Sequence, residues 1–115
     1  MEQPMYPAAT KEMSKEREQL APETLNAFRS FSRQVFAEGA LPSKTKELIA
    51  VAVAHVTQCP YCIRSHTQRA RQKGASGQEI MEAIWVAAEM RAGAAYAHSA
   101  LAIDVMDHEE TKSGS

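Results

Sequence analysis

The sequence has 115 residues and a mass of 12.6 kDa, with 13 Lys and Arg against 14 Asp and Glu. This length excludes a two-domain enzyme and predicts one compact domain. The net charge of -1 argues against a nucleic-acid-binding protein, because such binding depends on clustered Lys and Arg that release counterions from the phosphates.

Alanine dominates the apolar composition, with 20 alanines beside 26 Val, Ile, Leu, Met, Phe and Trp together. Alanine favours helix, but each one buries little of the apolar area that stabilises a fold by about 25 cal/mol per Å². We therefore expect a homo-oligomer that completes its core between subunits. An ordinary Ala-rich monomeric bundle is the alternative.

The sequence carries no sign of a membrane segment or a secretory leader. The longest apolar run covers only residues 48–54, far short of the roughly 20 residues that cross a bilayer. The first residues lack the basic stretch and apolar core of a signal peptide. Together these observations predict a cytoplasmic protein with no membrane partner.

All five prolines lie at or before position 60, which leaves the second half of the chain free to form helix. We expect an all-α domain over residues 21–107. It follows an N-terminal segment, residues 1–20, that is disordered over residues 1–9 and helical within its charged stretch KEMSKERE. Residues 108–115 are polar and aperiodic, which predicts a disordered tail.

Start and stop signals place five helices over residues 22–38, 44–56, 60–73, 76 to about 91, and 94–107. The second is apolar on nearly every face, which predicts burial on all sides. The fourth opens with a Ser-Gly-Gln-Glu capping box, in which serine and glutamate satisfy each other's backbone N–H groups. The fifth is mostly alanine and follows a glycine.

The two cysteines, Cys59 and Cys62, form a single Cys-x-x-Cys pair. In a reducing compartment such a pair indicates a redox or metal-binding role rather than a structural disulfide. Pro60 keeps Cys59 extended and opens a helix, so Cys59 should be the N-cap and Cys62 the third helical residue. The N–H groups at a helix start stabilise a thiolate and lower the pKa of a cysteine from about 8.5 toward neutrality.

His66 follows Cys62 by four residues, so both side chains should project from one helix face, about 5–6 Å apart at Cβ. A thiol and an imidazole are thereby placed as nucleophile and base. The break at residues 58–60 folds the chain back and can bring Glu47 to the same face. There a carboxylate would hold the histidine tautomer and raise its basicity, which gives a Glu–His–Cys proton relay.

The same residues fit two rival interpretations. Cys-Pro-Tyr-Cys is also the active-site tetrapeptide of glutaredoxins, but a thioredoxin-type fold needs more strands and a cis-proline, and no proline follows Cys62. Alternatively, a zinc ion could be held tetrahedrally by Cys59, Cys62 and His66 with Glu47 or His55. In that case the chain would be a non-enzymatic helical module.

Other residues have simpler explanations. His55 lies in an apolar segment, which favours a satisfied core histidine over a catalytic one. Trp85 and Tyr96 stand at helical positions that predict core or subunit contacts rather than a ligand cage. His55 is kept as an auxiliary candidate only. Arg91 and His98 could reach a pocket shared between subunits, but the sequence does not assign them to it.

The spacing Glu47-x11-Cys59-x2-Cys62-x3-His66, within KELIAVAVAHVTQCPYCIRSH, resembles the AhpD-like alkylhydroperoxidases of the carboxymuconolactone decarboxylase family. The resemblance implies an all-α fold, a homotrimer or homohexamer, and reduction of organic or hydrogen peroxides. It implies that Cys62 attacks the peroxide and Cys59 resolves the product as a disulfide. Glu47 and His66 would then be the proton relay.

The resemblance also implies a reaction without metal or organic cofactor and a thiol reductant, which is a lipoylated partner in some relatives. Tyr61 stands where AhpD has a histidine. The decarboxylases that name the family lack the cysteine pair, which disfavours lactone decarboxylation here. The remaining enzymatic alternative uses Glu47 and His66 as acid and base on a small acid.

Overall fold

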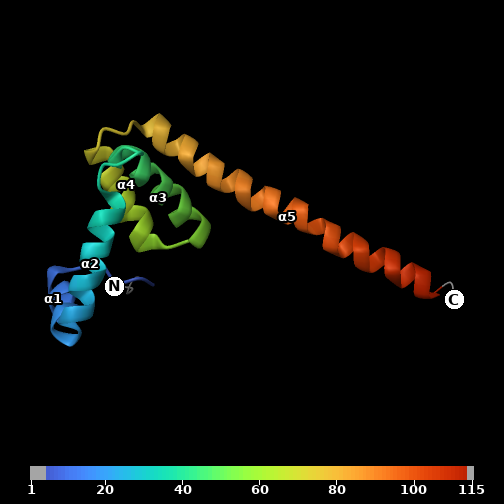
Figure 1. Cartoon of the computed structure of the whole chain (residues 1–115), viewed down its shortest axis with the longest axis horizontal. Helices are drawn as coiled ribbons and strands as arrows, with labels where there is room; N and C mark the ends of the chain where they lie inside the picture. The colour runs from blue at the N-terminus through green and yellow to red at the C-terminus, as the bar shows by residue number, and fades with distance from the viewer. Residues whose placement is uncertain (1–4, 114–115) are drawn as a thin grey trace.

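The computed structural model describes residues 5–113, with side chains up to residue 109, and over these residues the chain forms helices and no strand. The helices are α1 (Lys11–Leu20), α2 (Pro22–Phe36), α3 (Ser43–Thr57), α4 (Pro60–Gln72) and α5 (Gly77–Ser113). The predicted all-α class is confirmed, which excludes the thioredoxin-type fold. Figure 1 shows α2, α3 and α4 gathered at one end of the molecule, from which α5 projects.

The first two helices begin at local signals in the sequence. Thr10 caps α1, because its hydroxyl accepts a hydrogen bond from the backbone N–H of Met13. This is the short charged helix expected from KEMSKERE, and none of its residues is buried. Pro22 opens α2, since proline suits the first helical position, and the helix ends at Phe36, just before the predicted end.

A sharp reversal joins α3 to α4. Gln58 adopts the left-handed conformation (φ 57°), which is unfavourable for a residue with a Cβ atom and ends α3. The carbonyl of Ala54 accepts the backbone N–H groups of Gln58 and Cys59, and Cys59 becomes the N-cap of α4. The reversal lays α4 back along α3, so that side chains from both helices can meet in one site.

The buried core is small and lies where α3, α4 and the first turns of α5 meet. Its members are Val51, Ala70, Ala75 and Ile80, with Leu48 and Ile84 packed against them. The prediction that residues 44–56 are buried on all sides is wrong, because none of the described residues covers the outer face of α3. The exposed apolar side chains of that face are Ile49, Val53 and Val56.

The last helix differs most from the sequence-based prediction. The two helices expected over residues 76–91 and 94–107 are one continuous helix, α5. Gly93 does not end it, because a single glycine costs a helix only about 1 kcal/mol relative to alanine and its neighbours are alanines. The helix also continues to Ser113, through most of the segment expected to be irregular; residues 114–115 lie outside the described residues.

The projecting helix makes the chain elongated. Its radius of gyration is 20.7 Å, whereas a compact domain of this length has about 13 Å. The prediction of a compact unit is therefore wrong for the isolated chain. Trp85 and Tyr96 are 65% and 82% exposed, so neither is a core residue of this chain. No helix among residues 5–113 combines the length and apolarity needed to span a membrane.

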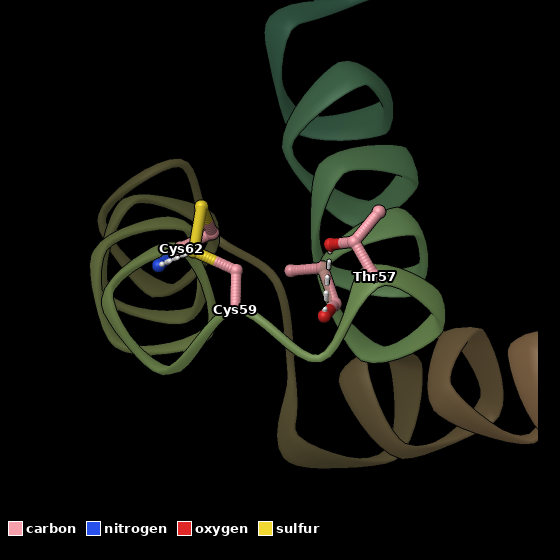
Figure 2. Close-up of a disulfide and its surroundings, with 4 residues drawn as sticks. Thr57, Cys59 and Cys62 are labelled. Carbon is pink, nitrogen blue, oxygen red and sulfur yellow. Dashed lines mark hydrogen bonds between the residues drawn. A yellow bond between two sulfur atoms is a disulfide. The ribbon is translucent and has the colours of Figure 1, made fainter. Parts of the chain in front are cut away.

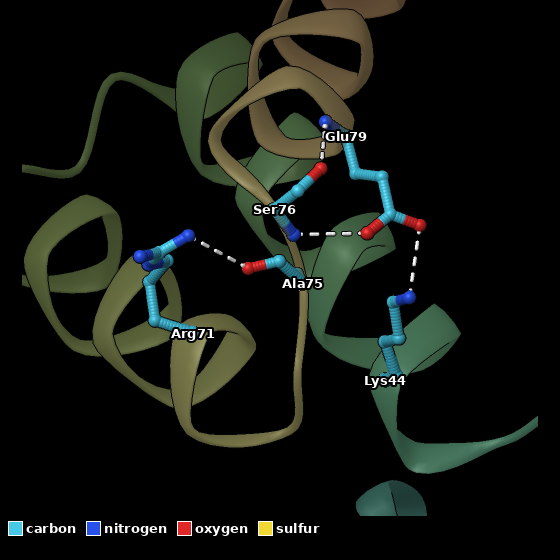
Figure 3. A network of polar contacts seen from close by, with 5 residues as sticks. All are labelled: Lys44, Arg71, Ala75, Ser76 and Glu79. Atoms are coloured by element: carbon cyan, nitrogen blue, oxygen red, sulfur yellow. Dashed lines mark hydrogen bonds and ion pairs between the residues drawn. The ribbon is translucent and has the colours of Figure 1, made fainter.

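The predicted capping box at the start of α5 is confirmed (Figure 3). The backbone N–H of Glu79 donates to Oγ of Ser76, at 3.0 Å, and the backbone N–H of Ser76 donates to Oε1 of Glu79, at 2.9 Å. Lys44 adds an ion pair from α3 to the other carboxylate oxygen, at 2.9 Å. The capping box thus also ties the start of α5 to the start of α3.

This arrangement predicts a pH-dependent contribution to stability. The pKa of the Glu79 carboxyl is lowered, mainly by the hydrogen bond from the backbone of Ser76 and further by Lys44. A lowered folded-state pKa stabilises the fold above the ordinary pKa of 4.5, and the contribution is lost as the pH falls through the lowered pKa. We expect Glu79→Gln, which keeps the hydrogen-bond acceptor, to lower the urea midpoint at pH 7 but not in acid. A difference that stays constant with pH would contradict the charge-based explanation.

Candidate active site

The two cysteines lie at the start of α4, beside the end of α3 (Figure 2). Cys59 is the N-cap and its sulfur accepts the backbone N–H of Cys62 at 3.3 Å, while the two sulfurs form a disulfide. The Cα atoms are 5.2 Å apart. The predicted N-cap and third helical positions of the pair are confirmed, so both sulfurs lie at the positive end of the helix dipole.

Glu47 and His66, which are 19 residues apart, meet across α3 and α4. Nδ1 of His66 lies 2.7 Å from Oε2 of Glu47. Glu47 is only 3% exposed. An ionised carboxylate can only accept, so with Glu47 in that form Nδ1 donates the hydrogen and Nε2 is the ring nitrogen that can accept a proton.

The structure adds Phe36 and Ser43, two residues that the sequence-based reasoning did not single out. The Phe36 ring stacks on the imidazole of His66, with centroids 5.1 Å apart and 25° between the planes. The buried hydroxyl of Ser43 donates to the carbonyl of Phe36 at 2.8 Å. These contacts hold the end of α2 against His66, and only the packing of three separate helices reveals them.

Two cavities adjoin the Glu47–His66 pair. One, of about 860 Å³, is lined by both Cys62 and His66 and is called the thiol cavity below. The other, of about 730 Å³, is lined by Glu47 and by four basic side chains of α2 and α4, which are Arg29, Arg33, Arg69 and Lys73. Glu47 therefore lines one cavity and His66 the other.

Tyr61, between the two cysteines, makes contacts that no local pattern indicated. Its hydroxyl donates to the backbone carbonyl of Pro7 at 2.7 Å. Its ring meets that of Tyr6 edge to face, with centroids 6.0 Å apart. Of the segment 1–9 expected to be disordered, residues 1–4 lie outside the described residues, while the rest lies against the start of α4 and lines the thiol cavity.

The remaining candidates lie apart from this group. His55 is half-buried and its Nδ1 pairs with the carbonyl of Val51 at 2.7 Å, so the expected satisfied histidine is confirmed. Arg91 and His98 lie on α5, and neither lines the two cavities. Within the described part of the chain, no three His, Cys, Asp or Glu side chains are grouped as metal ligands.

The arrangement suits proton transfer to and from a thiol. Cys62 and His66 are one helical turn apart on α4 and line the same cavity. The buried carboxylate lies against Nδ1 of His66, where such a partner holds an imidazole ring in one orientation. The structure thereby brings together a cysteine pair, an imidazole and a buried carboxylate, the groups from which a thiol nucleophile, its base and an orienting group can be built.

The sequence model of the carboxymuconolactone decarboxylase family matches residues 22–104, from α2 into α5. A relative from Paracoccus denitrificans, named uncharacterized protein 4 in cox locus, is 65% identical over 82 residues, which span 71% of this chain and 74% of that protein. The family match therefore covers all of α2, α3 and α4.

Two solved structures support the same family. A carboxymuconolactone decarboxylase family protein from Legionella pneumophila is 36% identical with a TM-score of 0.64, covering 70% of this chain and 75% of that chain. Another from Thermotoga maritima, for which an involvement in the antioxidative response has been suggested, is 30% identical with a TM-score of 0.57, covering 80% and 96%. This chain belongs to the carboxymuconolactone decarboxylase family, and its Cys59–Cys62 pair is consistent with the AhpD-like branch.

Proposed function

We propose that this protein is a thiol-dependent peroxidase that reduces peroxides through a Cys59–Cys62 disulfide cycle. The observation that carries the proposal is the juxtaposition of the cysteine pair with His66, whose imidazole is held by the buried carboxylate of Glu47. A helix start favours the reactive thiolate form, because its free N–H groups and dipole stabilise negative charge.

In the proposed reaction, Nε2 of His66 takes the proton of the Cys62 thiol while Glu47 stabilises the imidazolium. The thiolate then attacks the peroxide, so that an S–O bond forms and the O–O bond breaks. The leaving alkoxide or hydroxide takes the proton from His66 and departs as alcohol or water. Cys62 is left as a sulfenic acid.

The second half of the cycle resolves this sulfenic acid. The Cys59 thiol attacks the oxidised sulfur of Cys62, water leaves, and the disulfide forms. Two electrons have then passed from the two thiols to the peroxide. An external thiol or lipoyl-type dithiol restores the pair by attack on the disulfide, without a metal or organic cofactor. A reducing compartment such as the cytoplasm would supply that reductant.

We also propose that the chain works as a homotrimer or homohexamer. The support is the apolar surface that one subunit leaves exposed on α5 and on the outer face of α3. Monomeric proteins rarely expose contiguous apolar patches larger than a few hundred Å². A second copy would cover such surface.

A second candidate function is acid–base catalysis on a small acid, which the Glu47–His66 pair and the family's name favour. It differs from the peroxidase in one testable respect. Acid–base catalysis needs no change in the oxidation state of Cys59 or Cys62. Counting thiols therefore separates the two candidates.

The proposal predicts the number of thiols lost to peroxide. Reduced wild-type protein treated with one equivalent of cumene hydroperoxide should lose both of its thiols, since the chain has two cysteines. Cys62→Ser should keep the Cys59 thiol. Cys59→Ser should accumulate a sulfenic acid on Cys62, detected by mass spectrometry as its dimedone adduct.

The two serine variants are matched controls, because each removes one sulfur and leaves the other at the same helix start. If both wild-type thiols survive the peroxide, the disulfide cycle is refuted and the acid–base candidate takes its place. If the dimedone adduct forms on Cys59 in Cys62→Ser instead, the assigned roles of the two cysteines are reversed.

A further inference from the structure

The thiol cavity has a wall that comes from a distant part of the sequence. Residues 5–9, called the N-terminal strap below, line it together with the first turns of α4. The hydroxyl of Tyr61 holds the strap by its hydrogen bond to the carbonyl of Pro7 at 2.7 Å, and the ring of Tyr6 packs against that of Tyr61. Access to Cys62 from this side is therefore bounded by the strap.

The chemical character of the lining is uneven. Most of the strap is apolar, and Phe28, Pro60 and Tyr61 continue this apolar wall. Two arginines also line the cavity, Arg17 from α1 and Arg64 from α4. No Asp or Glu is among the lining residues, so neither cation meets a carboxylate inside the cavity. Such a lining suits a ligand with an apolar body and one anionic end.

The size of the cavity also favours an organic ligand. Its volume of about 860 Å³ far exceeds the space that hydrogen peroxide needs. Cavities of roughly 300–1,000 Å³ bind organic molecules of drug size. A peroxide group placed at Cys62 would leave most of this volume for the remainder of a substrate.

From these observations we infer that the thiol cavity takes an organic hydroperoxide that carries a carboxylate, of the fatty-acid type. Its carbon chain lies against the N-terminal strap and Tyr61, and its carboxylate pairs with Arg64, which lies on the same helix as Cys62. The inference rests on the proposed peroxidase function in one respect, namely that the ligand carries a hydroperoxide group. The binding of a molecule with an apolar chain and a carboxylate end is inferred from the shape and charge of the cavity alone.

Arg64→Gln provides the first test, in steady-state assays with linoleic acid hydroperoxide, cumene hydroperoxide and hydrogen peroxide. An exposed ion pair contributes about 1 kcal/mol or less, so we expect KM for the anionic substrate to rise about 3–5-fold. KM for the two neutral substrates should stay the same, and kcat should change little for all three. The matched control is Arg69→Gln on the same helix, since Arg69 lines the other cavity and not this one.

Tyr61→Phe tests the strap separately. It removes the hydroxyl that holds Pro7 and keeps the ring. We expect KM to rise for both organic hydroperoxides and to stay unchanged for hydrogen peroxide, which does not need the apolar wall. Equal changes for all three peroxides, or none with either variant, would overturn the inference.

A binding measurement keeps the inference apart from the peroxidase proposal. In reduced Cys59→Ser protein, decanoate should slow the alkylation of Cys62 by iodoacetamide, and Arg64→Gln should weaken this protection. Protection without any peroxide reduction would refute the proposed function and retain the carboxylate site. Peroxide reduction without protection would retain the function and refute the site.

Discussion

Glu47→Gln should slow the oxidation of Cys62 by peroxide about 100-fold, because a positioned acid–base pair contributes about 10²–10⁴-fold to a proton-transfer reaction. The substitution keeps the shape of the side chain, and its amide oxygen can still accept the Nδ1 hydrogen of His66. It removes only the negative charge, which stabilises the imidazolium formed as Cys62 loses its proton. Stopped-flow measurement of thiol loss would give the rate.

The control for this experiment is Glu79→Gln, the same substitution in a carboxylate that serves the capping box and does not line the thiol cavity. It should leave the oxidation rate unchanged. If Glu47→Gln is oxidised as fast as wild type, the proton relay has no role. If both variants are slowed equally, the effect comes from the stability of the helix bundle and not from the site.

Leu101→Glu should break the proposed oligomer. Leu101 is 66% exposed on the projecting part of α5. Covering a leucine side chain stabilises an assembly by about 1.5–3 kcal/mol, and a carboxylate in its place would have to lose its water shell on association. We expect wild type to sediment as a trimer or hexamer and Leu101→Glu as a monomer with a lower unfolding temperature.

Leu101→Met is the matched control, because it changes the shape of the side chain but keeps its volume and apolar character. It should sediment as wild type does. A wild-type protein that remains monomeric at micromolar concentration would refute the proposed assembly. A partner other than a second copy of this chain would then have to cover the exposed apolar side chains of α5.

The site illustrates how far local rules reach. The positions of Cys59 and Cys62 at the start of α4 were predictable, because Pro60 restricts its neighbour and opens a helix within one turn. The Ser76–Glu79 capping box was also predictable, because its two residues lie three positions apart and bond to each other's backbone N–H groups. Each of these features depends on backbone geometry and hydrogen bonds within three or four residues.

The contact between Glu47 and His66 depends on tertiary packing and not on local rules. Their spacing permitted it, but the 2.7 Å contact depends on the reversal at Gln58 and on how α4 packs along α3. The stacking of Phe36 on His66 likewise depends on where α2 ends in space. Packing between helices sets these distances, and no pattern within one helix encodes them.

The continuous α5 shows that a local signal can also mislead, because the glycine at position 93 predicted a break that the helix does not have. Gly93 is a weak helix breaker, and its alanine neighbours keep the helix intact. The sequence by itself determined the helical class, the starts of α2, α3 and α4 and the place of the cysteine pair, because these depend on short-range sterics and hydrogen bonds. Only the tertiary structure decided which side chains surround Cys62, because segments as distant as Pro7 and Tyr61 meet through packing.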